Sequence, residues 1–528
     1  MNKKILYMVL GTFMLSVLLT TSCTDLEEEP RDKITSEVLL EDPNLLINLV
    51  APALGQLRGF WSKDNVWGVM EATSDELCFP TRGSDWFDGG VWQEYWKLEW
   101  TPQNGDVKKV WNTLSTGIAS ANFAIGVLGE DENVSDEVKE YRSMLRFLRD
   151  YYMYLFIDLY GISPYRDPAS TAYDEFPEIF SREKAFYYVV SDMKAILNQM
   201  PERGDAAYGI PTRDAGRMLL AKLYLNKEIY TGVSGYDSAR IYLDQIINPG
   251  NYHLADDYFG IFKPKNDENF LQPGDEAIFT VPLDDADNYN LDNVVIWTNI
   301  TFHYNQSLSG GYNSNWNGCI APQGYLEECW FNGTDTATDV RWGDSSVYAE
   351  LAVVCGFNYG QQYNIAGEEI LDRGGNPLSF TFECPLENAA EVQGVRVLKY
   401  YPKAVVTVAS RVDNDFIVWR YADALLMKAE CLARGGDLGG AQSIVNEIRA
   451  KRGAPEITSG FELMDILDER GRELYWEGHR RQDMIRFGTY LLPKTNKETT
   501  SPETALLLPI PQTAIEPMEG RLIQNPGY

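Results

Sequence analysis

The spacing of apolar residues divides this chain into two helical blocks with a long non-helical stretch between them. In both blocks, apolar side chains recur every three or four residues, the pattern of a helix with one buried face. Gly, Pro, Asn or Asp residues bound these segments, as they bound helices in general. We expect helices at residues 42–57, 111–128, 136–160, 182–200, 212–230 and 236–247, and again at 417–434, 438–451, 461–477 and 479–487.

The stretch between the two blocks has a different composition. Residues 249–412 are rich in Asn, Gly, Asp, Tyr and Trp and lack helical periodicity, although 277–281 and 396–400 are apolar runs of strand length. The predicted fold is therefore mostly α: a helical scaffold, residues 37–248 and 413–528, that carries a long irregular, loop-rich insertion with short strands. Small residues alternate with large aromatic ones in the helices, which is typical of tetratricopeptide-like packing.

The first residues have the pattern of an export signal. Lys3 and Lys4 precede an apolar run from Ile5 to Leu19, which is too short to span a membrane comfortably. Small residues then lead to Cys23, an arrangement that resembles a bacterial lipobox, in which the cysteine is acylated. We expect a signal peptide at 1–22 and a lipid on Cys23. The alternative is an ordinary signal peptide with a free cysteine nearby.

An acidic segment follows Cys23. Residues 24–30 read Thr-Asp-Leu-Glu-Glu-Glu-Pro, which resembles the surface-export signal of lipoproteins displayed outside the outer membrane. We therefore expect an acidic tether at 23–36 and a single folded domain at 37–528, on the cell surface. The alternative for the acidic run is a solvated linker, which is the commoner role of such runs.

The charge of the chain excludes some classes of ligand. The 46 Lys and Arg residues face 77 Asp and Glu residues, a net charge of −31. Such a protein repels nucleic acid, whereas a neutral polymer meets no such barrier. Six cysteines beyond Cys23 form no CxxC motif, and only three histidines are present, so the sequence predicts no zinc site and no cofactor. The cysteines could pair, but buried free thiols are favoured.

Tryptophan-rich loops are the candidate binding regions. The first is residues 61–100 and the second is 288–342, and each combines tryptophans with Asp, Asn and Gly. Trp86 lies between two glycine-containing pairs, so we expect it in an exposed loop. Trp92, Trp96 and Trp100 recur at helical spacing, which fits a packing stripe as well as a platform. The candidate ligand-binding residues are Asp75, Arg82, Asp85, Trp86, Trp96, Trp297 and Trp316.

Several long segments resemble one protein family. The aromatic run 146–161 (RFLRDYYMYLFIDLYG), the segment 420–430 (RYADALLMKAE), the segment 469–486 (ERGRELYWEGHRRQDMIR) and the ending from LPIP at 508–511 to NPGY at 525–528 resemble SusD/RagB proteins, in the same order. With the lipobox, the resemblance covers essentially the whole chain, and it is weakest in the middle insertion.

The resemblance implies a function as well as a fold. It implies a tetratricopeptide-like scaffold and a surface lipoprotein that covers a SusC-like TonB-dependent barrel and captures oligosaccharides without cleaving them. A RagB-like capture of peptides is one alternative. A glycoside hydrolase is another, because among 77 acidic residues some pair of carboxylates always has suitable spacing. No GxSxG, HExxH, P-loop or GxGxxG motif is present.

The charged C-terminal motif has a structural interpretation. Glu469, Arg470, Glu473, Arg480 and Arg481, followed by Asp483, lie at helical spacing among apolar residues. We expect them to form a partly buried network of salt bridges that fixes helix packing, in preference to a catalytic site.

Overall fold

The structure is a computed structural model that describes residues 43–170, 175–204, 208–270, 275–283, 300–306, 315–344, 354–364, 366–401 and 413–528. Residues 46–528 form one compact unit, and of the separate unit 1–45 the structure describes only the first residues of helix α3 (Pro43–Gly59). The predicted signal peptide, Cys23 and the acidic tether therefore lie outside the described residues.

The helices begin where the sequence offers capping groups. The long helix α7 (Asp136–Leu159) starts at Ser135, whose hydroxyl accepts a hydrogen bond from the amide of Val138. Helix α6 (Gly105–Leu128) starts at Asn104, whose side chain accepts from two amides of the first turn. Such caps satisfy amide groups that have no partner within the helix. Almost every residue in the second half of α7 is buried, as its aromatic composition predicts.

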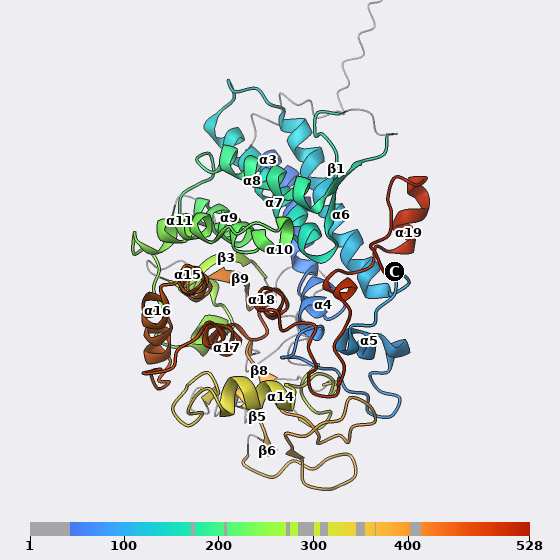
Figure 1. Ribbon diagram of the computed structural model, residues 1–528, viewed down its shortest axis with the longest axis vertical. Coiled ribbons are helices and arrows are strands. Elements are labelled where there is room, and N and C mark those ends of the chain that lie inside the picture. The colour runs from blue at the N-terminus through green and yellow to red at the C-terminus, as the bar shows by residue number, and fades with distance from the viewer. Residues whose placement is uncertain are drawn as a thin grey trace, which may run out of the picture. The chain divides into compact units, whose positions relative to one another are not determined.

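The helices stack in sequence and then across the insertion. The helix α6 packs on α7, α7 on α8 (Arg182–Ile196), α8 on α9 (Arg213–Leu225) and α9 on α11 (Tyr236–Ile247). The helix α11 then packs on the second block, which consists of α15 (Tyr421–Arg434), α16 (Leu438–Lys451), α17 (Leu463–Leu474) and α18 (Arg480–Phe487) (Figure 1). The two blocks are thus one scaffold of tetratricopeptide-like helix pairs, and the predicted fold class is confirmed.

A two-stranded sheet joins the insertion to the second block. Strand β3 (Ala277–Val281) pairs antiparallel with β9 (Phe416–Arg420), with Val281 opposite Phe416. The helix expected from residue 417 was therefore placed too early, because it begins at Tyr421. The run Phe-Ile-Val-Trp is rich in β-branched and aromatic residues, and pairing with β3 makes it a strand.

Other helix ends also differ from the expectation. The segment predicted as one helix at 212–230 is α9 followed by α10 (Lys227–Thr231), and the break lies at Asn226, whose side chain donates to the carbonyl of Lys222. The helix expected to start at 111 starts at Gly105. Those expected to end at 200 and 477 end earlier, at Ile196 and Leu474. The bounds expected for α11 and α16 are the observed ones.

The insertion contains short strands and turns, as expected. Strands β4 (Gly343–Asp344), β5 (Cys355–Asn358) and β8 (Arg396–Leu398) form one small sheet. Strands β6 (Gly360–Gln361) and β7 (Ser379–Phe380) form a hairpin. Helix α14 (Gln323–Tyr325) continues into the π-helical turn η3 (Leu326–Phe331), which packs on α17, and these elements gather below α17 in Figure 1.

A buried group of ion pairs lies where the second block meets the insertion. Arg420 contacts Glu276, Glu473 and Glu477 at 2.6–2.8 Å, and all four side chains are at most 1% exposed. The pairs of this charged centre are completed by Arg341, Arg452, Lys399, Arg449, Arg472 and Glu469. The predicted structural network is confirmed and is more deeply buried than expected.

The rest of the C-terminal motif forms further buried pairs. Arg470 contacts Asp423 and Asp483 at 2.9 and 2.7 Å, and Arg481 contacts Asp158 at 3.0 Å. The nearby carboxylates hold the pKa of Arg470 above its usual value against the opposing effect of burial. These arginines therefore stay charged, and their attraction to the carboxylates offsets part of the cost of burying both.

Candidate functional site

A strained loop between residues 82 and 90 presents the first tryptophan of the site. The backbones of Arg82 and Asp85 exchange two hydrogen bonds of 3.0 and 3.2 Å, which close a tight turn. Trp86 then adopts φ = 62° and Asp88 φ = 41°, in the left-handed region that side chains normally avoid. Such backbone costs on the order of 1–3 kcal/mol per residue and is concentrated at functional sites. The loop leads into helix α5 (Val91–Lys97).

The indole of Trp86 is held from behind and from one side. Its ring centroid lies 5.2 Å from that of Phe79 and 5.9 Å from that of Trp92. Its Nε1 donates to the carbonyl of Trp316 at 2.8 Å. A Cβ atom at Gly318 would lie 2.3 Å from the Trp86 ring, so only glycine fits there. Trp86 is half-buried, although its glycine-rich loop suggested full exposure, because these neighbours enclose the back of the ring.

Trp316 is the more open member of the pair. Its ring centroid is 6.3 Å from that of Trp86 at an interplanar angle of 45°, and 36% of the residue is exposed. The two rings border a cavity of about 440 Å³ that is also lined by Lys63, Ser84, Asp85, Asp88 and Tyr304. This volume is in the range of small-molecule sites.

The polar edge of this aromatic cavity is built around Asp85. Its carboxylate accepts a hydrogen bond of 2.7 Å from the hydroxyl of Tyr304. Burial, together with Asp85, raises the pKa of Tyr304 to about 12, so its hydroxyl stays protonated at neutral pH. The guanidinium of Arg373 lies 4.0 Å from the centre of the Tyr304 ring and 3.8 Å from Asp85. This edge therefore offers a carboxylate and an exposed cation.

Glu391 and His303 hold the side chain of Arg373 in place. Its Nε donates to Glu391, which also bonds Nε2 of the buried His303 at 3.0 Å. The Nδ1 atom of His303 accepts from the amide of Asn305, so the Nε2 atom carries the proton. Burial lowers the pKa of His303, which keeps the ring neutral. His303 thus orients Glu391 and, through it, Arg373.

Lys63 supplies the positive group on the other side. Its Nζ lies 5.7 Å from the centre of the Trp86 ring and 5.0 Å from that of Trp92. Asp88 accepts a hydrogen bond of 2.8 Å from Nε1 of Trp92. The cavity therefore combines two aromatic faces with donors and acceptors at its rim, which suits a flat ligand that carries hydroxyl groups.

Three of the predicted site residues do not line this cavity, and their polar groups bind other parts of the protein. Arg82 is 6% exposed, and its guanidinium donates to the carbonyls of Asn317, Ala390 and Gln393. Asp75 forms a two-bond ion pair with Arg480 at 2.7 and 2.9 Å.

Trp96, the third of these residues, is 1% exposed and donates to the carbonyl of Thr495. Trp297 lies outside the described residues. A role in binding stays a prediction for all four, whereas Asp85, Trp86 and Trp316 meet in one cavity.

Sequence reasoning missed six residues of the site, of which Ser84 and Asp88 lie in the same loop as the predicted Asp85 and Trp86. Lys63, Tyr304, Gly318 and Arg373 come from separate segments and belong to no motif. Lys63 lies within the first tryptophan-rich stretch and Tyr304 and Gly318 lie within the second, and that composition was the one signal that could have found them. Arg373 lies in neither stretch and is near the cavity only because of tertiary packing.

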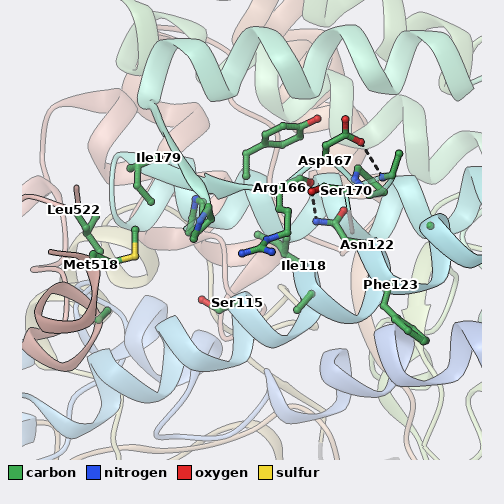
Figure 2. A pocket seen from close by; sticks show the side chains of 18 of the residues that line it. Ser115, Ile118, Asn122, Phe123, Arg166, Asp167, Ser170, Ile179, Met518 and Leu522 are labelled. Carbon is green, nitrogen blue, oxygen red and sulfur yellow. Dashed lines mark hydrogen bonds between the residues drawn. The ribbon is translucent and has the colours of Figure 1, made fainter. Parts of the chain in front are cut away.

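A larger cavity of about 660 Å³ lies elsewhere, between α6, the loop after strand β1 (Ile162–Tyr165) and the C-terminal segment (Figure 2). Its walls are mainly apolar, and two of its aromatic rings already pack on others. The ring centroids of Trp111 and Phe156 are 4.9 Å apart, and Tyr165 stacks on Phe180 with ring centroids 4.5 Å apart.

The polar side chains of this larger cavity also serve its own loop. Figure 2 shows Asn122 reaching to the carbonyl of Arg166, a bond of 3.2 Å, and the carboxylate of Asp167 accepts from the amide of Ala169. The smaller cavity, with its open ring faces and polar rim, is therefore the better candidate for a polyhydroxyl ligand.

Metal, thiol and membrane features add no second site. The six cysteines within the described ranges are all buried, and none of them forms a disulfide with another, as favoured. Among the same residues no cluster of His, Cys, Asp and Glu could hold a metal ion. No described helix is both long enough and apolar enough to span a bilayer.

Comparisons of the sequence with known proteins find similarity to SusD. Residues 387–528 match the model of the SusD family. The chain is 24% identical over 421 residues to the starch-binding protein SusD of Bacteroides thetaiotaomicron, which covers 76% of this chain and 73% of that protein.

Solved structures share the fold. A SusD superfamily protein from Parabacteroides distasonis matches with a TM-score of 0.71 and 20% identity, covering 94% of this chain and 100% of the other. The surface glycan-binding protein A from Bacteroides thetaiotaomicron, in complex with laminarihexaose, matches with a TM-score of 0.66 and 20% identity over 92% and 99%. The resemblance to the SusD/RagB family is thereby confirmed, both in sequence and in fold.

Proposed function

We propose that this protein captures oligosaccharides at the cell surface in the aromatic cavity and delivers them to a SusC-like TonB-dependent transporter of the outer membrane. The observation that carries the proposal is the pair Trp86 and Trp316, two partly open ring faces bordered by Asp85, Lys63 and Tyr304. Two similar proteins have names or structures that refer to starch and to laminarihexaose, which supports a glycan as the ligand class.

The chemistry of a sugar fits this arrangement. A pyranose ring has apolar C–H faces, which can lie on an indole, and a rim of hydroxyls, which lose water on binding and need new partners. Asp85 can accept from hydroxyls, whereas Lys63 and Arg373 can donate to them. The binding energy then comes from ring contact, and the rim fixes orientation.

A neutral glycan fits better than an anionic one. The two carboxylates that line the cavity, Asp85 and Asp88, balance Lys63 and the nearby Arg373, so the site has no excess of positive charge, and the whole chain carries a charge of −31. An acidic sugar would approach against this field. The ligand proposed is therefore an uncharged oligosaccharide.

Capture without cleavage is the proposed mode of action. The Asp85 carboxylate is bonded to Tyr304, and Asp88 is bonded to Trp92, so both already hold structural partners. The peptide alternative is disfavoured by the small number of charged donors and by the flat, paired rings. The hydrolase alternative predicts products, which a binding protein does not release.

A binding screen tests the ligand class. The purified chain from residue 37 would be applied to an array of neutral oligosaccharides, including maltooligosaccharides and laminarihexaose, and to a pool of peptides. We expect binding to one neutral glycan series, no peptide binding and no change in the glycan by chromatography. Peptide capture alone would support the RagB-like alternative, and shortened sugars would support the hydrolase.

The membrane anchor and the transporter are separate parts of the proposal. If Cys23 is acylated, labelled palmitate should mark the wild type, and Cys23→Ala should move the protein from the membrane fraction to the soluble extract. Label on the alanine variant would contradict the anchor. Under mild detergent the chain should co-purify with a large outer-membrane β-barrel, and elution alone after induction would argue against that partner.

A further inference from the structure

A second group of aromatic side chains reaches the surface of the insertion. Phe331 is 42% exposed and Tyr359 is 49% exposed, and Phe382 lies half-buried between them. The ring centroids of Phe331 and Phe382 are 5.2 Å apart, and those of Tyr359 and Phe382 are 5.1 Å apart. Single exposed aromatic residues are ordinary, but a contiguous group marks a binding surface.

The core beneath keeps this aromatic patch (Phe331, Tyr359 and Phe382) in place. Trp342 is 7% exposed, and its ring centroid lies 5.3 Å from that of Phe331 and 6.0 Å from that of Tyr359. Trp342 itself stacks on the buried Phe357 at 4.7 Å. The exposed rings are therefore fixed before any ligand arrives, which lowers the entropic cost of binding.

The segment that forms the patch also reaches the aromatic cavity. Tyr359 directly precedes the β6–β7 hairpin and Phe382 closely follows it. The segment that connects β6 to β7 contains Leu371 and Arg373. The backbone carbonyl of Leu371 accepts a hydrogen bond from Asn305, and the guanidinium of Arg373 stacks on Tyr304. Leu371 and Tyr363, which lie between the two sites along the hairpin, are each 46% exposed.

We propose that the aromatic patch is a second sugar platform, so that the natural ligand is a neutral polysaccharide chain that contacts both the cavity and the patch. This inference rests on the proposed function and adds the length of the ligand to it. The hydroxyl of Tyr359 makes no hydrogen bond within the described ranges, so it is available to a sugar hydroxyl. The exposed Glu383 beside Phe382 supplies an acceptor and disfavours an anionic chain.

Two linked contacts produce a dependence of affinity on chain length. A short oligosaccharide can occupy the cavity alone, whereas a longer chain that reaches the patch gains from the high effective concentration of its second segment. The first site therefore sets whether a sugar binds, and the patch sets how strongly a polymer is retained compared with a fragment.

The test compares a hexasaccharide with the parent polysaccharide of the series that the screen identifies. The double variant Phe331→Ser/Tyr359→Ser should bind the hexasaccharide as the wild type does and lose on the order of tenfold in affinity for the polymer. Tyr187→Ala is the matched control, because Tyr187 is 48% exposed but belongs to neither site, and it should change neither affinity. Trp316→Ala should weaken binding of both ligands.

The outcomes separate this inference from the proposed function. Equal polymer affinity in the wild type and the double variant, with hexasaccharide binding that depends on Trp316, would overturn the second platform and leave the function intact. If the double variant lost co-purification with the barrel while it kept its polymer affinity, the patch would be a protein-docking surface and the inference would be wrong. If no wild-type glycan binding occurred at all, both proposals would fail.

Discussion

The charged centre and the aromatic cavity have opposite relations to the solvent. In the charged centre Arg420, Glu473 and Glu477 are almost completely buried, and each contacts oppositely charged neighbours. In the cavity Trp316 is 36% exposed, and the ring of Trp86 is half-buried. The charged centre contains the residue types that often suggest catalysis, yet its side chains bind one another.

The difference shows where binding capacity is located in this molecule. A buried guanidinium that already contacts three carboxylates has little left to offer a ligand, and its contacts serve to hold helices together. An indole that is covered on one face only keeps the other for contact. We therefore assign stability to the charged centre and recognition to the cavity, a division that substitutions on each side can test.

The largest expected effect is the loss of stability in Arg420→Met. The substitution removes a cation that contacts Glu276, Glu473 and Glu477 together, and breaking such a buried pair typically costs about 3–5 kcal/mol. Urea unfolding followed by circular dichroism measures it. The control is Arg373→Met, which removes a half-exposed arginine and should cost less than about 1 kcal/mol. Equal effects in the two variants would refute the division.

A similar loss is expected from Trp96→Ala, which tests the structural side of the tryptophan set. Trp96 is 1% exposed, and the Nζ atom of Lys494 lies 3.8 Å from the centre of its ring. Truncation therefore leaves a cavity in the core, which lowers the free energy of unfolding by about 3–5 kcal/mol. Thermal and urea unfolding give the value. Glycan affinity of the folded fraction should stay near that of the wild type, and a selective loss of affinity would instead make Trp96 a binding residue.

A smaller effect is expected from Gly318→Ala, which acts on the cavity through Trp86. The new methyl group would lie 2.3 Å from the indole in its present place, so the ring must move. We expect glycan affinity to fall roughly tenfold, about 1.4 kcal/mol. Gly105→Ala, where nothing lies within 4 Å of the added carbon, is the matched control. Unchanged affinity in Gly318→Ala would show that the position of Trp86 is unimportant.

The smallest expected effect concerns pH and two buried glutamates, Glu71 and Glu76. Glu71 and Glu76 are buried, and their carboxylates accept from the amides of Gly478 and Trp476 respectively. Burial raises the pKa of Glu71 to about 7, and burial and the charge of Glu71 raise that of Glu76 above its usual value. Above about pH 4.5, the ordinary pKa of a glutamate, the folded state therefore binds more protons than the unfolded state.

Stability should therefore fall as pH rises from about 5 to about 8, since the folded chain must release protons that burial retains. In Glu76→Gln the fall in unfolding free energy between these pH values should be smaller, by on the order of 1 kcal/mol. Urea unfolding at several pH values measures the slope. An identical slope in the variant would mean that this pair does not share a buried proton.

The sequence predicted the scaffold well because amphipathic periodicity is a local signal. The bounds of α11 and α16 follow from apolar spacing, together with Gly235 and Asn248 at the ends of α11 and Asp437 at the start of α16. The strand β9 could not be separated from α15, because a short apolar run fits either state and only pairing with β3 decides. The network around Glu473 was foreseen as structural, but the part played by Glu276, which pairs with Arg420 from 144 residues away, was not.

The candidate site was predictable only in part. Trp86 and Trp316 were both singled out by composition, but their meeting across 230 residues depends on tertiary structure. Arg82 was expected at the ligand, and its three carbonyl partners could not be known from sequence. Lys63 and Tyr304 carry no motif, because a binding rim needs a charge or a hydroxyl in the right place and not in a particular sequence.

The central claim is tested most directly by measuring Trp316→Ala in two ways, by calorimetric titration with the glycan that the array identifies and by the thermal midpoint. Removing a central aromatic anchor typically costs about 2 kcal/mol of binding, or roughly thirtyfold in affinity. Trp316 is 36% exposed, so its removal should hardly change the midpoint. The account predicts lost affinity with a retained midpoint. Retained affinity, or a midpoint that falls as far as in Trp96→Ala, would contradict it.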